Sequence, residues 1–173
     1  MRTLDRDRAT LVVVDVQEAF RPAVGGFDEV VENTRRLMEG ARILGVPVVV
    51  TEQYPQGLGH TVDELGQVDA VEKSCFSAVK AEGFDLNGRD QALIAGIETH
   101  VCVSQTAHDL IDQGVEVHVA SDAVTSRTEQ NKDVGLHKME SSGAILTSVE
   151  TALFELLGAA GSEEFKQVQM LIK

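Results

Sequence analysis

Three side chains with complementary chemistry follow apolar runs of this sequence. Asp15 closes the run ATLVVVDVQ, Lys73 lies at the end of DAVEKS, and Cys102 comes shortly after ALIAG. A cysteine sulfur can add to a carbonyl carbon, a carboxylate can accept the thiol proton, and an ammonium can stabilise negative charge. Together these residues would form a nucleophilic site centred on a cysteine.

Each of the three residues also has an ordinary structural interpretation. A cysteine in an apolar helix commonly packs in a core, an aspartate after a strand commonly makes a turn, and a lysine is commonly a solvated surface charge. Cys75, in KSCFS, is a second candidate nucleophile. No clear helix start precedes Cys75, so packing is the favoured interpretation. A helix start and a nearby cation both lower a thiol pKa, which predicts a thiolate at Cys102.

The segments that must position these residues alternate between strand and helix patterns. Apolar runs typical of buried strands occupy 9–17, 46–53, 69–74, 92–96, 115–121 and 144–148. Helical spacing covers 27–45, 99–114, 128–143 and 149–158, with Ser148 as the expected N-cap of the last. This alternation predicts one α/β domain over residues 1–173, a doubly wound parallel sheet with helices on both faces.

The expected sheet brings the three reactive residues to one edge. Ligands of open parallel sheets bind beyond the carboxyl ends of the strands, near the point where strand order reverses. Asp15, Lys73 and Cys102 all follow such ends. The loops at 18–26, 53–67 and 121–128 are expected to shape the substrate pocket.

Composition narrows the class of partner. The 173 residues include 28 acidic and 15 basic side chains, a formal net charge of −13 that disfavours nucleic acid. The sequence contains no apolar run of about 18 residues, so no membrane span is expected. No signal-peptide pattern precedes the first strand. Two cysteines do not make a disulfide framework. We therefore expect a cytoplasmic protein.

Several motifs resemble the isochorismatase-like hydrolases, also called cysteine hydrolases. VVVDVQEAF, EKSCFS and GIETHVCV carry the Asp, Lys and Cys of that family in the family's order. TEQYPQGLGHTV, EKSCFS and the C-terminal FKQVQMLIK resemble its isochorismatase domain-containing branch. The resemblance implies a three-layer α/β/α, Rossmann-like fold with a six-stranded parallel sheet. It also implies a triad in which Asp15 accepts the proton, Lys73 stabilises the charged pair and Cys102 attacks.

The same resemblance implies a cis peptide bond between Ile97 and Glu98. That bond would turn backbone N–H groups, including that of Cys102, toward a developing oxyanion. Family members are usually homo-oligomers, so we expect a dimer or higher assembly.

The sequence departs from two groups of relatives. Nicotinamidases hold a metal with an Asp-x-His motif after the second strand, where this chain has Glu52, Gln53 and Tyr54. His60 is near but lacks a matched partner, so we expect no metal, and no organic cofactor is required. Isochorismatases proper lack the cysteine and cleave an enol ether, which this chain's Cys102 argues against.

The predicted function is hydrolysis of a small-molecule amide, carbamoyl or related C–N bond through a thioester. Ester hydrolysis by the same triad is one alternative, and a catalytically weak partner-binding module is another. The candidate pocket residues are Gln17, Phe20, Tyr54 and His100. For Phe20 and Tyr54, packing that anchors the loops is an equal alternative.

Overall fold

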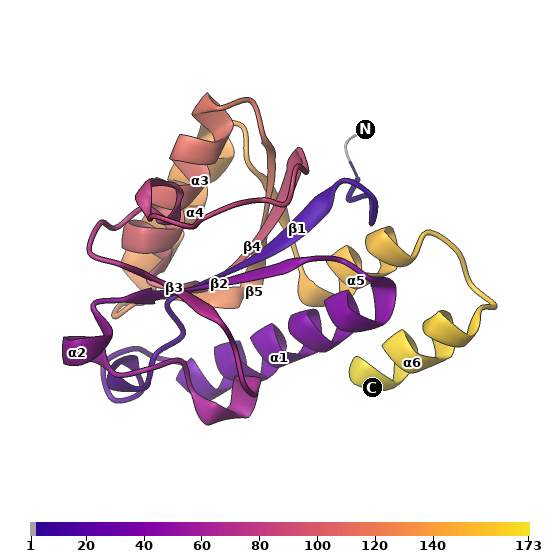
Figure 1. Ribbon diagram of the computed structural model, residues 1–173, viewed down its shortest axis with the longest axis horizontal. Coiled ribbons are helices and arrows are strands. Elements are labelled where there is room, and N and C mark those ends of the chain that lie inside the picture. Colours follow the sequence, from indigo (N-terminus) through magenta and orange to yellow (C-terminus); the bar gives the residue numbers. More distant parts are fainter. Residues whose placement is uncertain (1–2) are drawn as a thin grey trace.

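A six-stranded parallel sheet forms the centre of the protein. The computed structural model describes residues 3–173, and within them the strand order is β3-β2-β1-β4-β5-β6 (Figure 1). Every neighbouring pair is parallel. The strands are β1 (Ala9–Val14), β2 (Val48–Gln53), β3 (Ala70–Lys73), β4 (Gln91–Ile97), β5 (Glu116–Thr125) and β6 (Ile145–Thr147). The predicted three-layer, doubly wound fold is confirmed.

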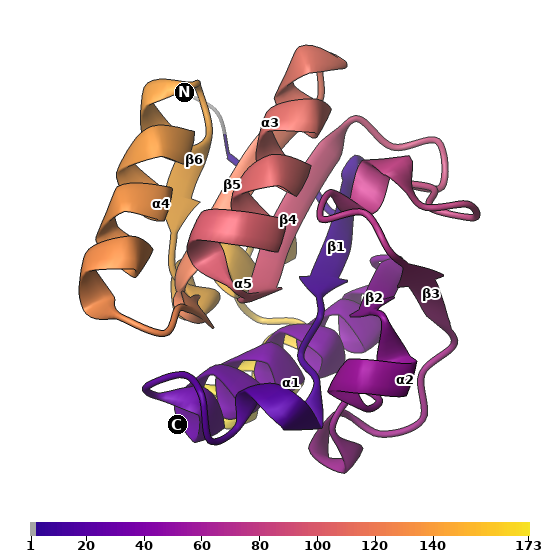
Figure 2. The ribbon, with the colours of Figure 1, turned by 90° about the vertical axis from the view of Figure 1, so that its left-hand side faces the viewer.

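Helices cover both faces of the sheet. One face packs against α1 and α5, on which α6 lies in turn, and the other packs against α3 and α4 (Figures 1 and 2). The α-helices are α1 (Phe27–Leu44), α2 (Pro55–Leu58), α3 (Ser104–Asp112), α4 (Glu129–Ser141), α5 (Val149–Leu157) and α6 (Glu163–Leu171). Short 3-10 helices lie at Glu18–Phe20, Asp63–Leu65 and Ala78–Lys80. No helix of residues 3–173 is long and apolar enough to cross a membrane.

The two central strands are buried along their whole length. All residues of β1 and β4 are buried, because helices shield both faces of a doubly wound sheet. The core is aliphatic, and its two halves on either side of the sheet are built mainly from valine, leucine, isoleucine and alanine. This rigid pair of strands carries the candidate site at its carboxyl end.

A glycine permits the close approach of β1 and β4 at that end. Gly96 has φ of 127°, and a Cβ on it would lie 2.0 Å from the Val14 carbonyl oxygen. A side chain at Gly96 would therefore push apart the strand ends that precede Asp15 and the cysteine segment. The strand order reverses between the same two strands, which is where ligands of this fold class bind.

Three elements differ from the sequence-based expectation. The strand predicted at 115–121 continues to Thr125, so much of the supposed loop at 121–128 is sheet. The pairing of β4 with β5 shifts register between Ile94, which pairs with Val119, and Gly96, which pairs with Val124. The helix predicted at 99–114 begins as the π-helical turn Thr99–Val103, called the cysteine turn below, and ends at Asp112 as α3. The loop predicted at 53–67 starts at the last residue of β2 and contains α2 and a 3-10 turn.

Candidate active site

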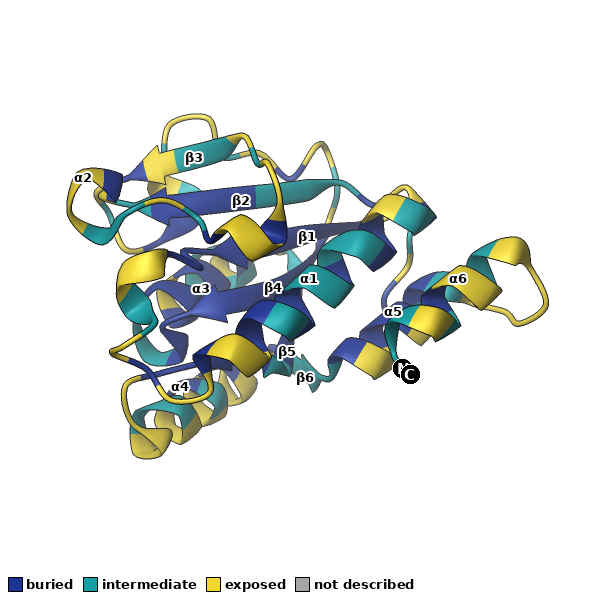
Figure 3. Cartoon of the chain, turned by 90° about the horizontal axis from the view of Figure 1, so that it is seen from below, coloured by how far each residue is buried: buried dark blue, intermediate teal, exposed yellow. Residues whose placement is uncertain are grey.

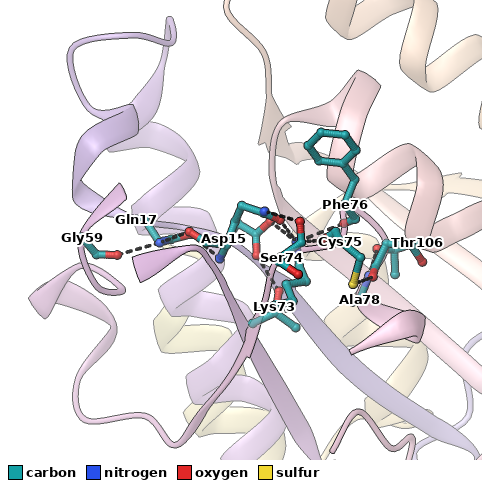
Figure 4. Close-up of polar contacts among 12 residues, drawn as sticks. Asp15, Gln17, Gly59, Lys73, Ser74, Cys75, Phe76, Ala78 and Thr106 are labelled. Carbon is teal, nitrogen blue, oxygen red and sulfur yellow. Dashed lines mark hydrogen bonds and ion pairs between the residues drawn. The ribbon is translucent and has the colours of Figure 1, made fainter. Parts of the chain in front are cut away.

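A buried ion pair joins the end of β1 to the end of β3. Asp15 follows β1 with φ of 53°, a left-handed conformation that aspartate tolerates better than most residues. Lys73 is the last residue of β3, and its Nζ donates to Asp15 Oδ2 at 2.6 Å (Figure 4). Both side chains have no exposed surface. The sequence placed these residues at one edge of the sheet, and the structure brings them into contact.

The other carboxylate oxygen of Asp15 has its own donor. Thr51 Oγ1, fully buried on β2, donates to Asp15 Oδ1 at 2.7 Å. Thr51 is paired with Val14 across the sheet, so its hydroxyl stands beside the residue that follows β1. Charge-assisted hydrogen bonds of this kind stabilise an ionised carboxylate in a buried position.

Lys73 Nζ is surrounded by oxygen atoms of neighbouring residues. Besides Asp15 it contacts Gln53 Oε1 at 2.8 Å and the carbonyl oxygens of Phe76 and Cys75 at 3.0 and 3.3 Å. The Gln53 amide also donates to the Ser74 carbonyl at 2.9 Å, which fixes the loop that supplies those carbonyls. A buried ammonium is stable only where such partners replace water.

The cysteine turn places Cys102 beside this ion pair. The peptide bond between Ile97 and Glu98 is cis, at the position that the family resemblance implied. The Glu98 carbonyl accepts hydrogen bonds from the N–H groups of Val101 and Val103 at 3.0 and 3.2 Å. The N–H of Cys102, which lies between those two, does not donate to that carbonyl.

The thiol of Cys102 interacts with both charged residues, and its pKa is raised to about 12. Burial is the largest cause, because it penalises the thiolate, and the Asp15 carboxylate raises the pKa further. Lys73 lowers the pKa but does not offset these two effects. The prediction of a resting thiolate was therefore wrong: the sequence did not reveal how deeply the sulfur is buried or how close it lies to Asp15.

Polar pairs support the turn from the β5 side. Glu98 is buried, and its Oε2 accepts from the backbone N–H and the Nε of Arg127, both at 3.0 Å. His100 Nδ1 lies 3.0 Å from Ser126 Oγ. The segment after β5 thus holds the residues on both sides of Thr99 in place.

The four candidate pocket residues have different surroundings. The amide of Gln17 is buried and fully engaged: it donates to the carbonyls of Gln53 and Gly59 and accepts from the Gln53 N–H (Figure 4). These bonds hold the loop after β2 and leave little for a ligand. Phe20 packs partly buried against the core. Tyr54 is 58% exposed and lines a hollow of about 260 Å³ beside Lys73. His100 is half-buried in the cysteine turn.

The position of the nicotinamidase metal motif is occupied by a closed hydrogen-bond set. Glu52 Oε1 accepts from the N–H and the Oγ1 of Thr61, and Oε2 lies 3.0 Å from His60 Nδ1. Burial opposes ionisation of Glu52, but these bonds outweigh it and lower the pKa of the carboxyl. His60 thus has a partner in Glu52. Within residues 3–173, no group of three His, Cys, Asp or Glu side chains could hold a metal.

Cys75 contributes through its backbone. Its carbonyl is one of the acceptors of Lys73, and its half-buried sulfur donates to the Ser77 carbonyl at 3.3 Å. Sequence reasoning missed Thr51 and Gln53. Their position was the available signal, since Thr51 pairs with the residue before Asp15, and Gln53 pairs with Lys73.

Comparison with known proteins identifies the family. A model of the isochorismatase domain matches residues 9–151. The chain belongs to the isochorismatase family. Isochorismatase domain-containing protein 2A from Mus musculus is 42% identical over 172 residues, covering 96% of this chain and 84% of the mouse protein. The predicted branch of the family is therefore confirmed.

Solved structures of the isochorismatase fold superpose closely on the chain. The structure of MAR1 ribonuclease from Caenorhabditis elegans is 38% identical, with a TM-score of 0.92, and covers 99% of this chain and 92% of that one. YcaC from Pseudomonas aeruginosa, solved with hexane-2,5-diol and covalent acrylamide, is 25% identical with a TM-score of 0.88. The superposition covers 98% of this chain and 91% of the YcaC chain.

Proposed function

We propose that this isochorismatase-family protein is a thiol-dependent hydrolase of small-molecule amides, carbamoyl compounds or related C–N bonds. The observation that carries the proposal is the contact of a buried thiol with a buried carboxylate–ammonium pair where the strand order reverses. A cysteine kept only for packing does not require two buried charges beside it.

Because its pKa is raised, the Cys102 thiol must lose its proton as it attacks, and the neighbouring Asp15 is the general base that accepts it. As the sulfur adds to the substrate carbonyl, Asp15 takes the thiol proton, so no free thiolate accumulates beforehand. The tetrahedral oxyanion is stabilised by backbone N–H groups of the cysteine turn, among them that of Cys102. When the C–N bond breaks, Asp15 returns the proton to the departing amine, leaving a thioester on Cys102.

Water completes the cycle with the same groups. Asp15 accepts a proton from the attacking water, the tetrahedral adduct collapses, and the C–S bond breaks. The sulfur regains its proton from Asp15 and the acid product departs. Lys73 offsets the negative charge that Asp15 and the sulfur share during both steps, held in place by Gln53 and two loop carbonyls.

The substrate is expected to be small and not a polyanion. The covalent acrylamide of the YcaC structure is a small amide-bearing electrophile, and it fits a family with a reactive nucleophile. The ribonuclease activity in the name of the nematode neighbour makes RNA a second substrate to test. The net charge of −13 opposes it, because a phosphate backbone is repelled by such a surface.

A substrate panel tests the proposal. Wild type and Cys102→Ala are compared on small amides, carbamoyl compounds, matched esters and single-stranded RNA. We expect C–N hydrolysis by wild type that disappears in Cys102→Ala, with mass spectrometry trapping an acyl group on Cys102. Preferential ester turnover would support the alternative bond class. RNA cleavage that survives Cys102→Ala, or no turnover at all, would contradict the proposal, and the latter would favour a partner-binding module.

A further inference from the structure

Thr51 holds Asp15 at two points. Its backbone carbonyl accepts the Asp15 N–H at 3.1 Å, and its Oγ1 donates to Asp15 Oδ1 at 2.7 Å. One residue of β2 therefore fixes both the backbone and the carboxylate of the residue that follows β1. Asp15 needs this support, because a φ of 53° is a left-handed conformation that a non-glycine residue keeps only where its surroundings hold it.

The side chain of Thr51 is itself fixed. It is fully buried in the half of β2 that lies nearer the site, which Figure 3 shows in dark blue. Threonine is branched at Cβ, so its χ1 has few accessible values and its hydroxyl stays beside the carboxylate. Within residues 3–173, the Thr51 hydroxyl makes its hydrogen bond to Asp15 alone. The hydroxyl therefore serves the carboxylate and no other group of the described chain.

The two oxygens of the Asp15 carboxylate have different donors. Oδ2 accepts from the charged Lys73 ammonium at 2.6 Å, whereas Oδ1 accepts from the neutral Thr51 hydroxyl. A positive charge lowers the proton affinity of the oxygen it touches more than a neutral hydroxyl does. Oδ1 is therefore the better proton acceptor of the two, and it is the oxygen whose position Thr51 sets.

We propose that Thr51 is a positioning residue of the reaction, which aims Asp15 Oδ1 at the Cys102 thiol. This inference rests on the proposed hydrolase function. As the sulfur attacks, the S–H bond breaks and its proton moves to Oδ1, while the Thr51 hydroxyl keeps its own proton. The hydroxyl also disperses part of the Asp15 charge, which otherwise opposes loss of the thiol proton.

Removal of the hydroxyl tests the proposal without requiring turnover. Thr51→Val keeps the branched shape but leaves the Asp15 charge less stabilised. Alkylation of Cys102 by iodoacetamide should then require a pH about 0.5–1 unit higher than in wild type. Thr51→Ser keeps the donor and should give the wild-type profile. Should Thr51→Val not fold, Thr51→Ala takes its place, since it also lacks the hydroxyl.

A double variant shows whether the effect passes through Asp15. In the Asp15→Asn background the charge on which the hydroxyl acts is absent. Adding Thr51→Val there should therefore shift the alkylation profile of Cys102 no further. An additional shift of the same size would mean that Thr51 influences the thiol by another route, and would overturn the proposal.

Thr10 supplies the matched control. It is fully buried on β1, and its Oγ1 donates to the Leu86 carbonyl at 2.7 Å, the same length as the bond from Thr51. Thr10 lies near the start of β1, whereas Asp15 follows the end of that strand. Thr10→Val should lose a similar amount of stability in urea unfolding and leave the alkylation profile of Cys102 unchanged.

Turnover separates this inference from the proposed function. On an amide that wild type hydrolyses, Thr51→Val should lower kcat by about tenfold or more with KM nearly unchanged, because the hydroxyl acts through Asp15 and not on the substrate. A wild type without hydrolase activity would contradict the proposed function, and the alkylation profiles would still decide whether Thr51 acts on the thiol through Asp15. The inference is overturned by a profile that Thr51→Val leaves unchanged, by an equal shift in Thr10→Val, or by Thr51→Ser behaving like Thr51→Val.

Discussion

At the residue scale, Cys102 interacts with both Asp15 and Lys73, so in the proposed hydrolase each substitution has a distinct signature. The sulfur is a protonated thiol at rest because burial and the neighbouring carboxylate both raise its pKa. Reactivity in such a site depends on delivering the thiol proton to Asp15 at the moment of attack. Alkylation, which needs only thiolate, and turnover, which needs proton transfer in both directions, must therefore respond differently.

Asp15→Asn separates the two readouts. Asparagine is nearly isosteric but removes the charge that raises the Cys102 pKa and the base that accepts its proton. We expect turnover to fall by about 10²- to 10⁴-fold, while alkylation of Cys102 by iodoacetamide speeds up at mildly alkaline pH. The pH profile of alkylation, followed by peptide mass spectrometry with Cys75 as the internal reference, checks this. Near-normal turnover, or slower alkylation, would contradict the assignment of Asp15 as base.

Lys73→Met should move the thiol in the opposite direction. Methionine fills a similar volume without the charge that lowers the Cys102 pKa. Alkylation should then require higher pH than in wild type, and the activity profile should shift with it. Removing one partner of a buried ion pair also costs about 3–5 kcal/mol of stability, so thermal unfolding is measured alongside. An unchanged alkylation profile in a folded variant would show that Lys73 acts only as a structural cation.

At the scale of elements, the sequence predicted strands and helices better than the turns between them. The apolar runs that became β1 and β4 and the spacing of α1 report burial directly, because helices and strands have fixed periods. Ser148 caps α5 as expected, accepting from the Thr151 N–H. The π-helical start of the cysteine turn and the extension of β5 depend on packing between distant segments, which periodicity does not encode.

The candidate site shows the same division. Order along the chain and family resemblance located Asp15, Lys73 and Cys102, because parallel strand ends meet at one edge. The partners that hold them, Thr51 and Gln53, come from β2 and become visible only with the strand register. The direction of the Cys102 pKa shift could be derived only from the three-dimensional structure, because it is set by burial and by the neighbouring Asp15 and Lys73.

Gly135→Ala tests how α4 supports the cysteine turn. The added Cβ would lie 2.9 Å from backbone atoms of Thr99 and His100, too close for atoms that cannot rotate away. We expect a stability loss of about 1–3 kcal/mol from overpacking and a larger fractional loss of kcat than of substrate affinity. Gly25→Ala, where a Cβ meets nothing within 4 Å, is the control. Equal kcat in the two variants would show that the turn tolerates displacement by α4.

At the scale of the whole molecule, the stability contributed by the acidic surface and that contributed by two hydrogen-bonded, poorly exposed carboxylates change in opposite directions with pH. Protonation in acid relieves the repulsion of a chain with a net charge of −13. Glu52 and Glu116, by contrast, have their pKa values lowered against the opposing effect of burial by hydrogen bonds, from Thr61 and His60 in one case and from His118 and Gln91 in the other. The balance at each pH sets the free energy of unfolding.

Glu52→Gln isolates the buried contribution. A carboxyl whose folded pKa is depressed adds stability that is present above its unfolded pKa, about 4.3, and is lost as pH falls through the folded value. The variant should be less stable than wild type at neutral pH by about 1–3 kcal/mol, and the difference should shrink below about pH 4. Urea unfolding across this range measures it, with the exposed Glu150→Gln as a control of equal charge change. A constant difference at all pH values would mean that Glu52 stabilises the loop by its shape, with its charge contributing nothing.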